Sequence, residues 1–385
     1  MQHERQTRRA LRGMVQPLVR FLRAEGTGGL VLALAAAAAL IWANWPALPS
    51  YEATWRGAPR FVVNDGMMTA FFYLAGLELR RERSSGELRE RARAILPVVA
   101  AIGGMIAPAL IYLAIARGGA ARGWGIPVAT DLAFALGVIA IVGRGLPVSL
   151  RVFLLALAII DDLGAIIVIA VFYSHDIAIS GLVVVAIATA AVLALRRRVH
   201  LLVLAVPAVL IWLGLAHAHV HPTLAGVILG MLVPAEPERA TRVEQALHPW
   251  VAFGVMPVFA LANAGIDLRA PLANTSVLVA VAAGLVVGKT LGITGATALA
   301  VRLGIAKLPQ GASWHGIVLV AAVAGIGFTM SLFVAGLAFG DRPDLEAAAR
   351  LGMLVGSALA VAVAVPCSYL ARRQRTSNES HARRG

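Results

Sequence analysis

Long apolar runs, separated by short polar stretches, repeat along the whole chain of 385 residues. Several runs contain roughly 18 or more residues, enough for a helix to cross a hydrocarbon core about 30 Å thick. They lack the alternation of apolar and polar positions that an outer-membrane β-strand shows. The pattern predicts an all-α integral membrane protein of about twelve transmembrane helices, at residues 27–45, 62–79, 94–116, 124–143, 148–173, 178–195, 200–216, 222–234, 249–264, 276–302, 315–339 and 346–371.

Basic residues fall mainly in the two tails and in alternate loops between these segments. With an even number of spans, both tails lie on the same side of the membrane. The largest clusters of basic residues then fall on that side, at residues 5–23, 80–93, 196–198 and 372–384. Cytoplasmic loops carry the excess of lysine and arginine, so both termini are predicted to be cytoplasmic. We predict one multi-pass membrane domain over 1–385, with cytoplasmic segments at 1–26 and 372–385.

The composition supports a membrane location and excludes a nucleic-acid partner. The chain is 59% hydrophobic and 14% charged, with a mean hydropathy of +0.81. A soluble domain is nearer a quarter charged. The net charge of +14 is explained by the basic loops and needs no polyanion, while membrane lipid is the expected surrounding. The only cysteine, Cys367, leaves no intrachain disulfide.

Four charged residues stand well inside predicted helices: Asp131, Asp161, Asp162 and Lys289. A charge at the membrane centre costs at least about 2.5–3.5 kcal/mol on insertion scales. One interpretation is an acid–lysine pair that only holds helices together. Three acids against one base, however, leave an excess of carboxylate, which indicates that a cation or proton completes the balance.

Asp161 and Asp162 are adjacent in the motif LALAIIDDLGAIIVIA. Adjacent helical positions differ by about 100° in direction, so one carboxylate can face an aqueous cavity while the other meets a neighbouring helix. Two carboxylates this close titrate as a coupled pair. Carboxylate oxygens are also the preferred ligands of a hard cation. A site that binds either protons or a cation has the minimum chemistry of an antiporter.

Two further features set this region apart. Lys289 is one of only two lysines in the chain, and its ammonium can lose a proton whereas a guanidinium cannot.

Glycine and proline interrupt the motif GIPVATDLAFALG before Thr130 and Asp131, and Gly325 and Gly327 interrupt a second span. Such breaks are typical of half-helices that bind ions, and the charged residues would compensate their ends. The simpler interpretations are a chance lysine and the general abundance of glycine and proline in membrane helices.

The motifs LAIIDD and ATDLAFALG, followed by VGKTLGI and GIGFTMSLF, resemble the bacterial NhaA-type sodium/proton antiporters from residue 27 to the last span. The resemblance implies inverted-topology repeats and two broken, crossing helices. It implies electrogenic, pH-regulated export of Na⁺ and Li⁺ in exchange for H⁺ across the cell inner membrane, by alternating access. It also implies a transporter rather than an enzyme, with no cofactor.

Residue roles follow from the same resemblance. Asp162 resembles the carboxylate that binds Na⁺ and exchanges protons, with Asp161 beside it and Lys289 paired with Asp161. Thr130 and Asp131 resemble the residues at the crossing, with the other break at Gly325 and Gly327. The residues that resemble the family's pH-response positions lie in the motifs AGLELRRERS, VEQALHPW and HVHPTLAGV, and are Glu78, Glu82, Glu244, His248 and His221.

The chain departs from the family pattern at two places. Gln245 stands where a second histidine of the pH-response cluster is expected. The stretch 45–64 is shorter than the family's periplasmic β-hairpin, which forms much of the dimer contact. The resemblance implies a homodimer, but the short stretch argues against dimerisation through that hairpin, so any such dimer would have a shortened hairpin contact.

Other functions fit the sequence less well. An intramembrane aspartyl protease needs one aspartate on each of two facing helices, whereas Asp161 and Asp162 are adjacent. A cation channel or a symporter of related fold differs only in proton coupling, which residues alone do not distinguish. The alternate histidines His217, His219 and His221 fall in a short loop and are a weak candidate for a metal site.

Overall fold

The computed structural model describes residues 27–46, 50–85, 91–143, 146–174, 176–197, 202–269 and 274–382. These residues fold into helices joined by short loops and include no strand, which confirms the predicted all-α class. The predicted cytoplasmic segment 1–26 lies outside the described residues. The predicted C-terminal tail lies partly within them, because the last helix continues to Ala382.

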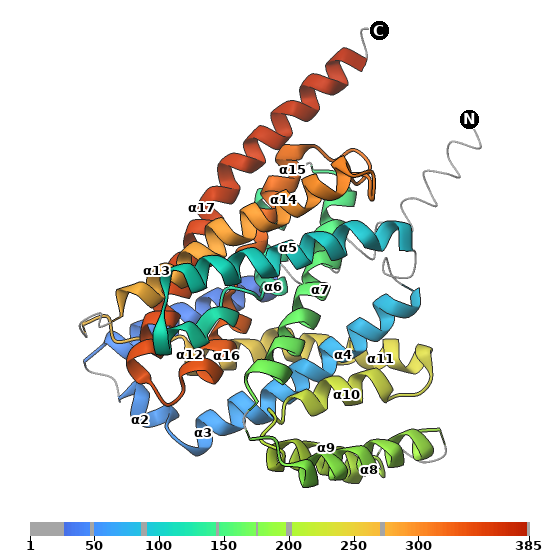
Figure 1. Ribbon diagram of the computed structural model, residues 1–385, viewed down its shortest axis with the longest axis vertical. Helices are drawn as coiled ribbons and strands as arrows, with labels where there is room; N and C mark the ends of the chain where they lie inside the picture. Colours follow the sequence, from blue (N-terminus) through green and yellow to red (C-terminus); the bar gives the residue numbers. More distant parts are fainter. Residues whose placement is uncertain are drawn as a thin grey trace.

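The helices pack side by side in one bundle (Figure 1). The first described helix is Thr27–Asn44. It is followed by α2 (Tyr51–Trp55), α3 (Ala58–Phe61), the π-helical turn η1 (Val62–Met67), α4 (Met68–Ser85), α5 (Arg91–Ile115), the 3₁₀ helix η3 (Gly118–Gly125), α6 (Leu132–Val142), α7 (Val148–Phe172) and α8 (Ile179–Leu195).

The second half of the chain contributes the remaining helices. They are α9 (Ala205–His217), α10 (Leu224–Leu232), α11 (Pro237–Trp250), η4 (Val251–Val255), α12 (Met256–Asn263), α13 (Thr275–Ala283), η5 (Gly284–Gly288), α14 (Lys289–Arg302), α15 (Trp314–Ala324), α16 (Phe328–Phe339) and α17 (Pro343–Ala382). Helices α15 and α16 lie at the centre of the bundle, and most of their side chains are buried.

Six described helices are long and apolar enough to cross a membrane, or seven if the bent pair α15–α16 is one span. Each of the twelve predicted segments contains at least part of a described helix. Several of these, such as α6, α8 and α9, are apolar but shorter than a full crossing. Twelve full spans and an inverted repeat therefore remain predictions.

Two predicted stretches differ from the structure. The segment expected at 249–264 is only the second part of a continuous helix, Pro237–Asn263, because the polar run before it forms the amphipathic helix α11. The stretch 45–64, expected as a shortened hairpin, has no strand in its described part and instead contains α2, α3 and the start of η1. Its buried Tyr51 anchors this stretch on its own chain by donating a hydrogen bond to the carbonyl of Leu261 (2.9 Å).

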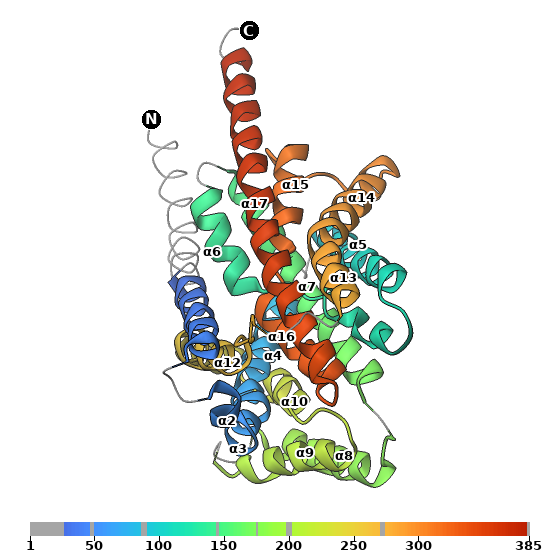
Figure 2. The ribbon, with the colours of Figure 1, turned by 90° about the vertical axis from the view of Figure 1, so that its left-hand side faces the viewer.

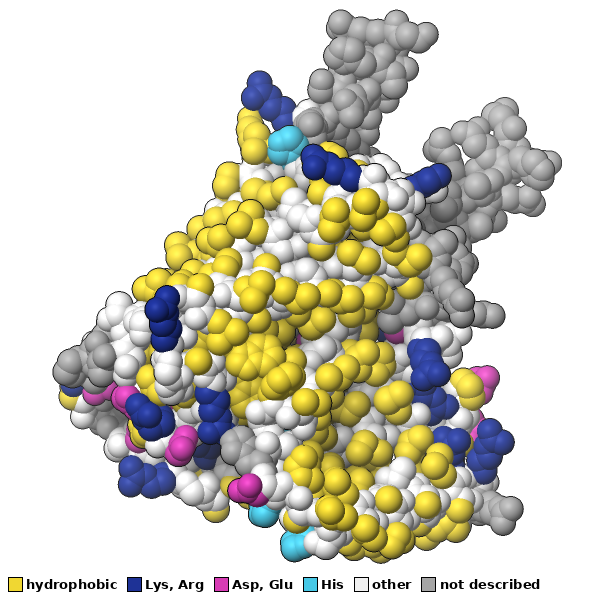
Figure 3. Space-filling view, in the orientation of Figure 1, with side chains coloured by type: hydrophobic (Ala, Val, Ile, Leu, Met, Phe, Trp, Pro, Cys, Tyr) yellow, Lys and Arg dark blue, Asp and Glu magenta, His cyan; other side chains and the backbone are white. Residues whose placement is uncertain are grey.

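The outer surface carries a broad apolar band. Hydrophobic side chains extend as a broad band across the face in Figure 3, and most of the charged side chains lie toward its margins. Exposed residues include Leu110, Ile187 and Leu299, each more than half accessible. Such a surface would be unfavourable in water and suits lipid. Together with the long apolar helices, it identifies a multi-pass membrane protein.

Glycines let α4 and α10 approach at backbone distance, and the two helices lie side by side in both ribbon views (Figures 1 and 2). A Cβ added at Gly226 would lie 2.3 Å from the carbonyl oxygen of Thr69, and one at Gly230 would lie 2.3 Å from that of Tyr73. Within a membrane, helices associate through such close packing rather than through a hydrophobic driving force. The same device joins α5 to α14, where Gly103 meets Gly292.

We expect Gly230→Ala to lower the thermal stability of the purified protein in detergent. The added methyl forces α10 away from α4, and overpacking of this kind costs about 1–3 kcal/mol. Gly295→Ala is the matched control, because a Cβ at Gly295 meets no atom within 4 Å and should leave the melting temperature unchanged or slightly raised. Equal melting temperatures for the two variants would contradict the close-packing argument.

Candidate functional site

Two interruptions in the helices meet at the centre of the protein. The first is residues 126–131, between η3 and α6, where Pro127 lacks a backbone donor. The second lies between α15 and α16, which are bent by 44°. The backbone N–H of Asp131 donates a hydrogen bond of 2.7 Å to the carbonyl of Ile326, so the two breaks are in direct contact.

The Asp131 carboxylate caps the first turns of two helices. Its Oδ1 accepts a hydrogen bond from the N–H of Phe134 in α6 (2.9 Å). Its Oδ2 accepts from the N–H of Thr329 in α16 (2.9 Å) and from the Thr329 hydroxyl (2.6 Å). N–H groups in a first helical turn have no intrahelical acceptor and carry partial positive charge. One buried carboxylate therefore compensates two helix N-termini.

The hydroxyl of Thr130 links the breaks to α7. Its Oγ1 lies 2.7 Å from Asp161 Oδ2 and 2.8 Å from the carbonyl oxygen of Ala324, the last residue of α15. A hydroxyl has one proton to donate, so it serves one of these two acceptors at a time. Thr130 thus connects the negative end of a half-helix to the carboxylate pair.

Asp161 is fully buried and paired with Lys289, which is also fully buried. The ammonium lies 2.5 Å from Asp161 Oδ2, the oxygen that Thr130 approaches. The second oxygen, Oδ1, is buried with no hydrogen-bond partner among the described residues. The resemblance paired these two side chains, and the structure brings them together from α7 and α14.

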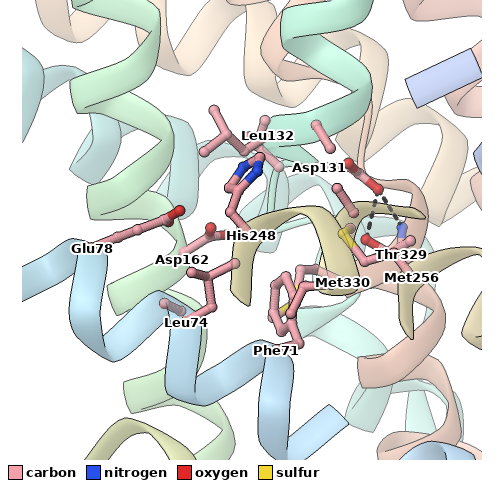
Figure 4. Close-up of a pocket in the computed structure, with 15 residues that line it drawn as sticks. Phe71, Leu74, Glu78, Asp131, Leu132, Asp162, His248, Met256, Thr329 and Met330 are labelled. Carbon is pink, nitrogen blue, oxygen red and sulfur yellow. Dashed lines mark hydrogen bonds between the residues drawn. The ribbon is translucent and has the colours of Figure 1, made fainter. Parts of the chain in front are cut away.

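Asp162 points to a different environment. It lines a narrow pocket of about 50 Å³, with room for a few water molecules, together with Glu78, Asp131 and Thr130. A smaller cavity on the α7 side also touches both Asp162 and Glu78. Figure 4 shows these two carboxylates and the His248 ring in one part of the pocket, and the Asp131–Thr329 contact in another. Asp162 Oδ1 is buried without a hydrogen-bond partner in the described part of the chain.

The five residues that resemble pH-response positions divide into two groups. Glu78 and His248 line the pocket, Glu82 is buried on α4, and Glu244 forms an ion pair with Arg81. His221 lies apart from them.

The His221 ring contacts Thr223 (2.7 Å), and its Nε2 lies 3.7 Å from Asp65 Oδ1. Burial lowers the pKa of His221 to about 4, so its imidazole is neutral near pH 7.

The alternate histidines His217, His219 and His221 do not point to a common position. His217 contacts Ser180, and His219 contacts the carbonyl of Asp176. Over the residues described, no three His, Cys, Asp or Glu side chains are placed to hold a metal ion.

Sequence reasoning missed several residues of the site. Thr329, the second residue of α16, was not singled out, because nothing in the sequence shows that its hydroxyl donates to Asp131, 198 residues earlier. Ser331, whose hydroxyl donates to the carbonyl of Ile126 (2.6 Å), and Arg81 gave no such signal. Their partners lie far away in sequence, so only the folded chain reveals the contacts.

Comparison with known proteins gives a consistent result. The family described as Na⁺/H⁺ antiporter 1 matches residues 19–367. The chain is 46% identical to a protein of Sorangium cellulosum named Na(+)/H(+) antiporter NhaA 2, over 95% of this chain and 92% of that protein. It is 45% identical to the Na(+)/H(+) antiporter NhaA of Serratia proteamaculans, over 91% of this chain and 97% of that protein. Matches of this extent leave one assignment, and the chain belongs to the Na⁺/H⁺ antiporter 1 family.

Proposed function

We propose that this protein is an electrogenic, pH-regulated antiporter that exports Na⁺, and also Li⁺, in exchange for H⁺ by alternating access at Asp161 and Asp162. The observation that carries the proposal is the unequal pair itself. Asp161 is neutralised by Lys289, while Asp162 faces a pocket and has a buried oxygen without a described partner. The proposal includes twelve spans with inverted repeats, placed in the inner membrane with both termini in the cytoplasm.

The chemistry follows from competition for the same oxygens. An ionised Asp162 attracts a hard cation, and protonation of the carboxylate removes both the charge and the ligand. The Thr130 hydroxyl and the free Oδ1 of Asp161 supply further oxygen ligands close by. Sodium and protons therefore exclude each other at Asp162, which is the requirement for coupled exchange.

Lys289 couples the pair to the cation in this proposal. When sodium draws Asp161 toward the site, the ammonium loses its counter-ion in a fully buried position. An unpaired buried ammonium is strongly disfavoured, so the Asp161–Lys289 pair and sodium binding oppose each other. An excess of protons over sodium ions in each cycle, which the family resemblance implies, would make the exchange electrogenic.

Glu78, Glu82, Glu244 and His248 are proposed to set the pH response, because they lie on α4 and α11 beside the pocket. His221 is proposed to act separately through its contact with Asp65, and only at acid pH, because burial lowers its pKa to about 4. Gln245, exposed on α11, replaces a titratable histidine and would alter the pH profile. A homodimer in lipid is also proposed, with α2 and α3 in place of the family's hairpin.

The first test removes the charge of Asp162. We expect Asp162→Asn to reduce sodium-induced collapse of a proton gradient in everted vesicles at least a hundred-fold, because an amide neither ionises nor exchanges a proton in this range. Asp267→Asn is the control, since Asp267 is exposed on a loop and should leave exchange intact. Exchange that survives Asp162→Asn at equal protein levels would overturn the proposal.

The second test separates the structural part of the Asp161–Lys289 pair from its function. Lys289→Met leaves a buried carboxylate without its counter-ion, a change that typically costs about 3–5 kcal/mol. We expect a clearly lower melting temperature for this variant, and recovery in the double variant Asp161→Asn, Lys289→Met. The double variant should still lack normal sodium/proton exchange in liposomes. Normal exchange with restored stability would show that the pair is only structural.

A further inference from the structure

The end of α7 is joined to the first broken segment by a contact that has no assigned role. Tyr173 caps α7 and follows the helix that carries Asp161 and Asp162. Its hydroxyl accepts a hydrogen bond from the N–H of Gly125 (3.2 Å) and donates one to the carbonyl of Arg122 (2.8 Å). It therefore holds the last turn of η3, directly before the break begins.

Neighbouring contacts leave this end of η3 little freedom. The Phe172 and Trp124 rings meet edge to face, with centroids 5.0 Å apart. Gly125 admits the tyrosine because it lacks a side chain, since a Cβ there would lie 2.8 Å from the Tyr173 hydroxyl oxygen. The chain then turns tightly, with the N–H of Val128 donating to the carbonyl of Gly125 (3.2 Å).

Helix α7 therefore holds the broken segment at two places. At one end Tyr173 binds Gly125, and at the other Asp161 accepts the Thr130 hydroxyl (2.7 Å). Only a short stretch of chain separates Gly125 from Thr130, and its first part is fixed in the turn. Because this turn is hydrogen-bonded and Pro127 fixes one of its backbone dihedrals, we expect a displacement of Gly125 to shift the hydroxyl of Thr130 beside the carboxylate pair.

We propose that Tyr173 is a positioning residue for cation binding, acting through the segment 125–130 to keep the Thr130 hydroxyl against Asp161. The inference rests on the proposed function, because it assigns a role within the same ion site. Tyr173 does not touch the carboxylates, and it acts by keeping the broken segment and α7 together as one unit. Without the hydrogen bonds of Tyr173, Thr130 occupies a broader range of positions. Binding of a cation must then restrict more motion, which weakens the affinity.

The test is Tyr173→Phe, which keeps the ring and removes both hydrogen bonds. In liposomes we expect the apparent KM for sodium to rise about three- to ten-fold, with kcat changed less than two-fold. This is less than the loss of two hydrogen bonds would give, because only part of the change reaches the ion site. Tyr112→Phe is the matched control. The Tyr112 hydroxyl donates to the carbonyl of Ala120, five residues before Gly125 in the same 3₁₀ helix (2.8 Å). Its removal leaves both hydrogen bonds of Tyr173 in place, so KM should stay unchanged.

A second measurement tests the route through Thr130. If Tyr173 acts by placing that hydroxyl, Tyr173→Phe should raise KM much less in a Thr130→Val background than in the wild type. An unchanged KM in Tyr173→Phe, or equal increases in both tyrosine variants, would overturn the inference. Full additivity with Thr130→Val would do the same. Absence of sodium/proton exchange in the wild-type protein would instead overturn the proposed function, so the two failures are distinguishable.

Discussion

Helices α6 and α16 both begin inside the bundle, and their first N–H groups have no preceding turn to accept them. In a low dielectric such groups are costly unless a partner is supplied. Asp131 supplies it for both helices at once, through separate oxygens of one carboxylate. The contact between the two helix breaks therefore depends on the buried negative charge of Asp131. The N-termini of α6 and α16 must stay close together for this one carboxylate to bind both.

Packing of the surrounding helices keeps these two breaks close together, although the hydrophobic effect contributes little to it inside a membrane. A membrane offers little hydrophobic gain for packing one apolar helix on another, so close backbone approach becomes the main attraction. Gly284 and Gly288 of η5 lie against Pro127 and Pro108, next to the lysine that follows in α14. Small residues thus place Lys289 against α7, and its electrostatic role depends on this packing.

Much of this arrangement was predictable from the sequence. The apolar runs located parts of the helices, and the cost of a buried charge singled out Asp131, Asp161, Asp162 and Lys289. The partners were not predictable by the same reasoning, since Lys289 is 128 residues from Asp161 and Thr329 is 198 from Asp131. Helix α11 was not predicted, because its many charged residues were interpreted as part of a polar loop between two spans.

The same helix geometry explains why two adjacent aspartates need not do the same work. A turn of about 100° between neighbours sends Asp161 toward Thr130 and Lys289, and Asp162 toward the pocket that contains Glu78. Both are rigidly attached to α7, so a movement of that helix shifts the ion-paired and the pocket-facing carboxylate together. Any change at the pocket that moves α7 therefore also reaches the Asp161–Lys289 pair. Adjacency in sequence thus links the two carboxylates mechanically, while divergence in direction gives them different surroundings.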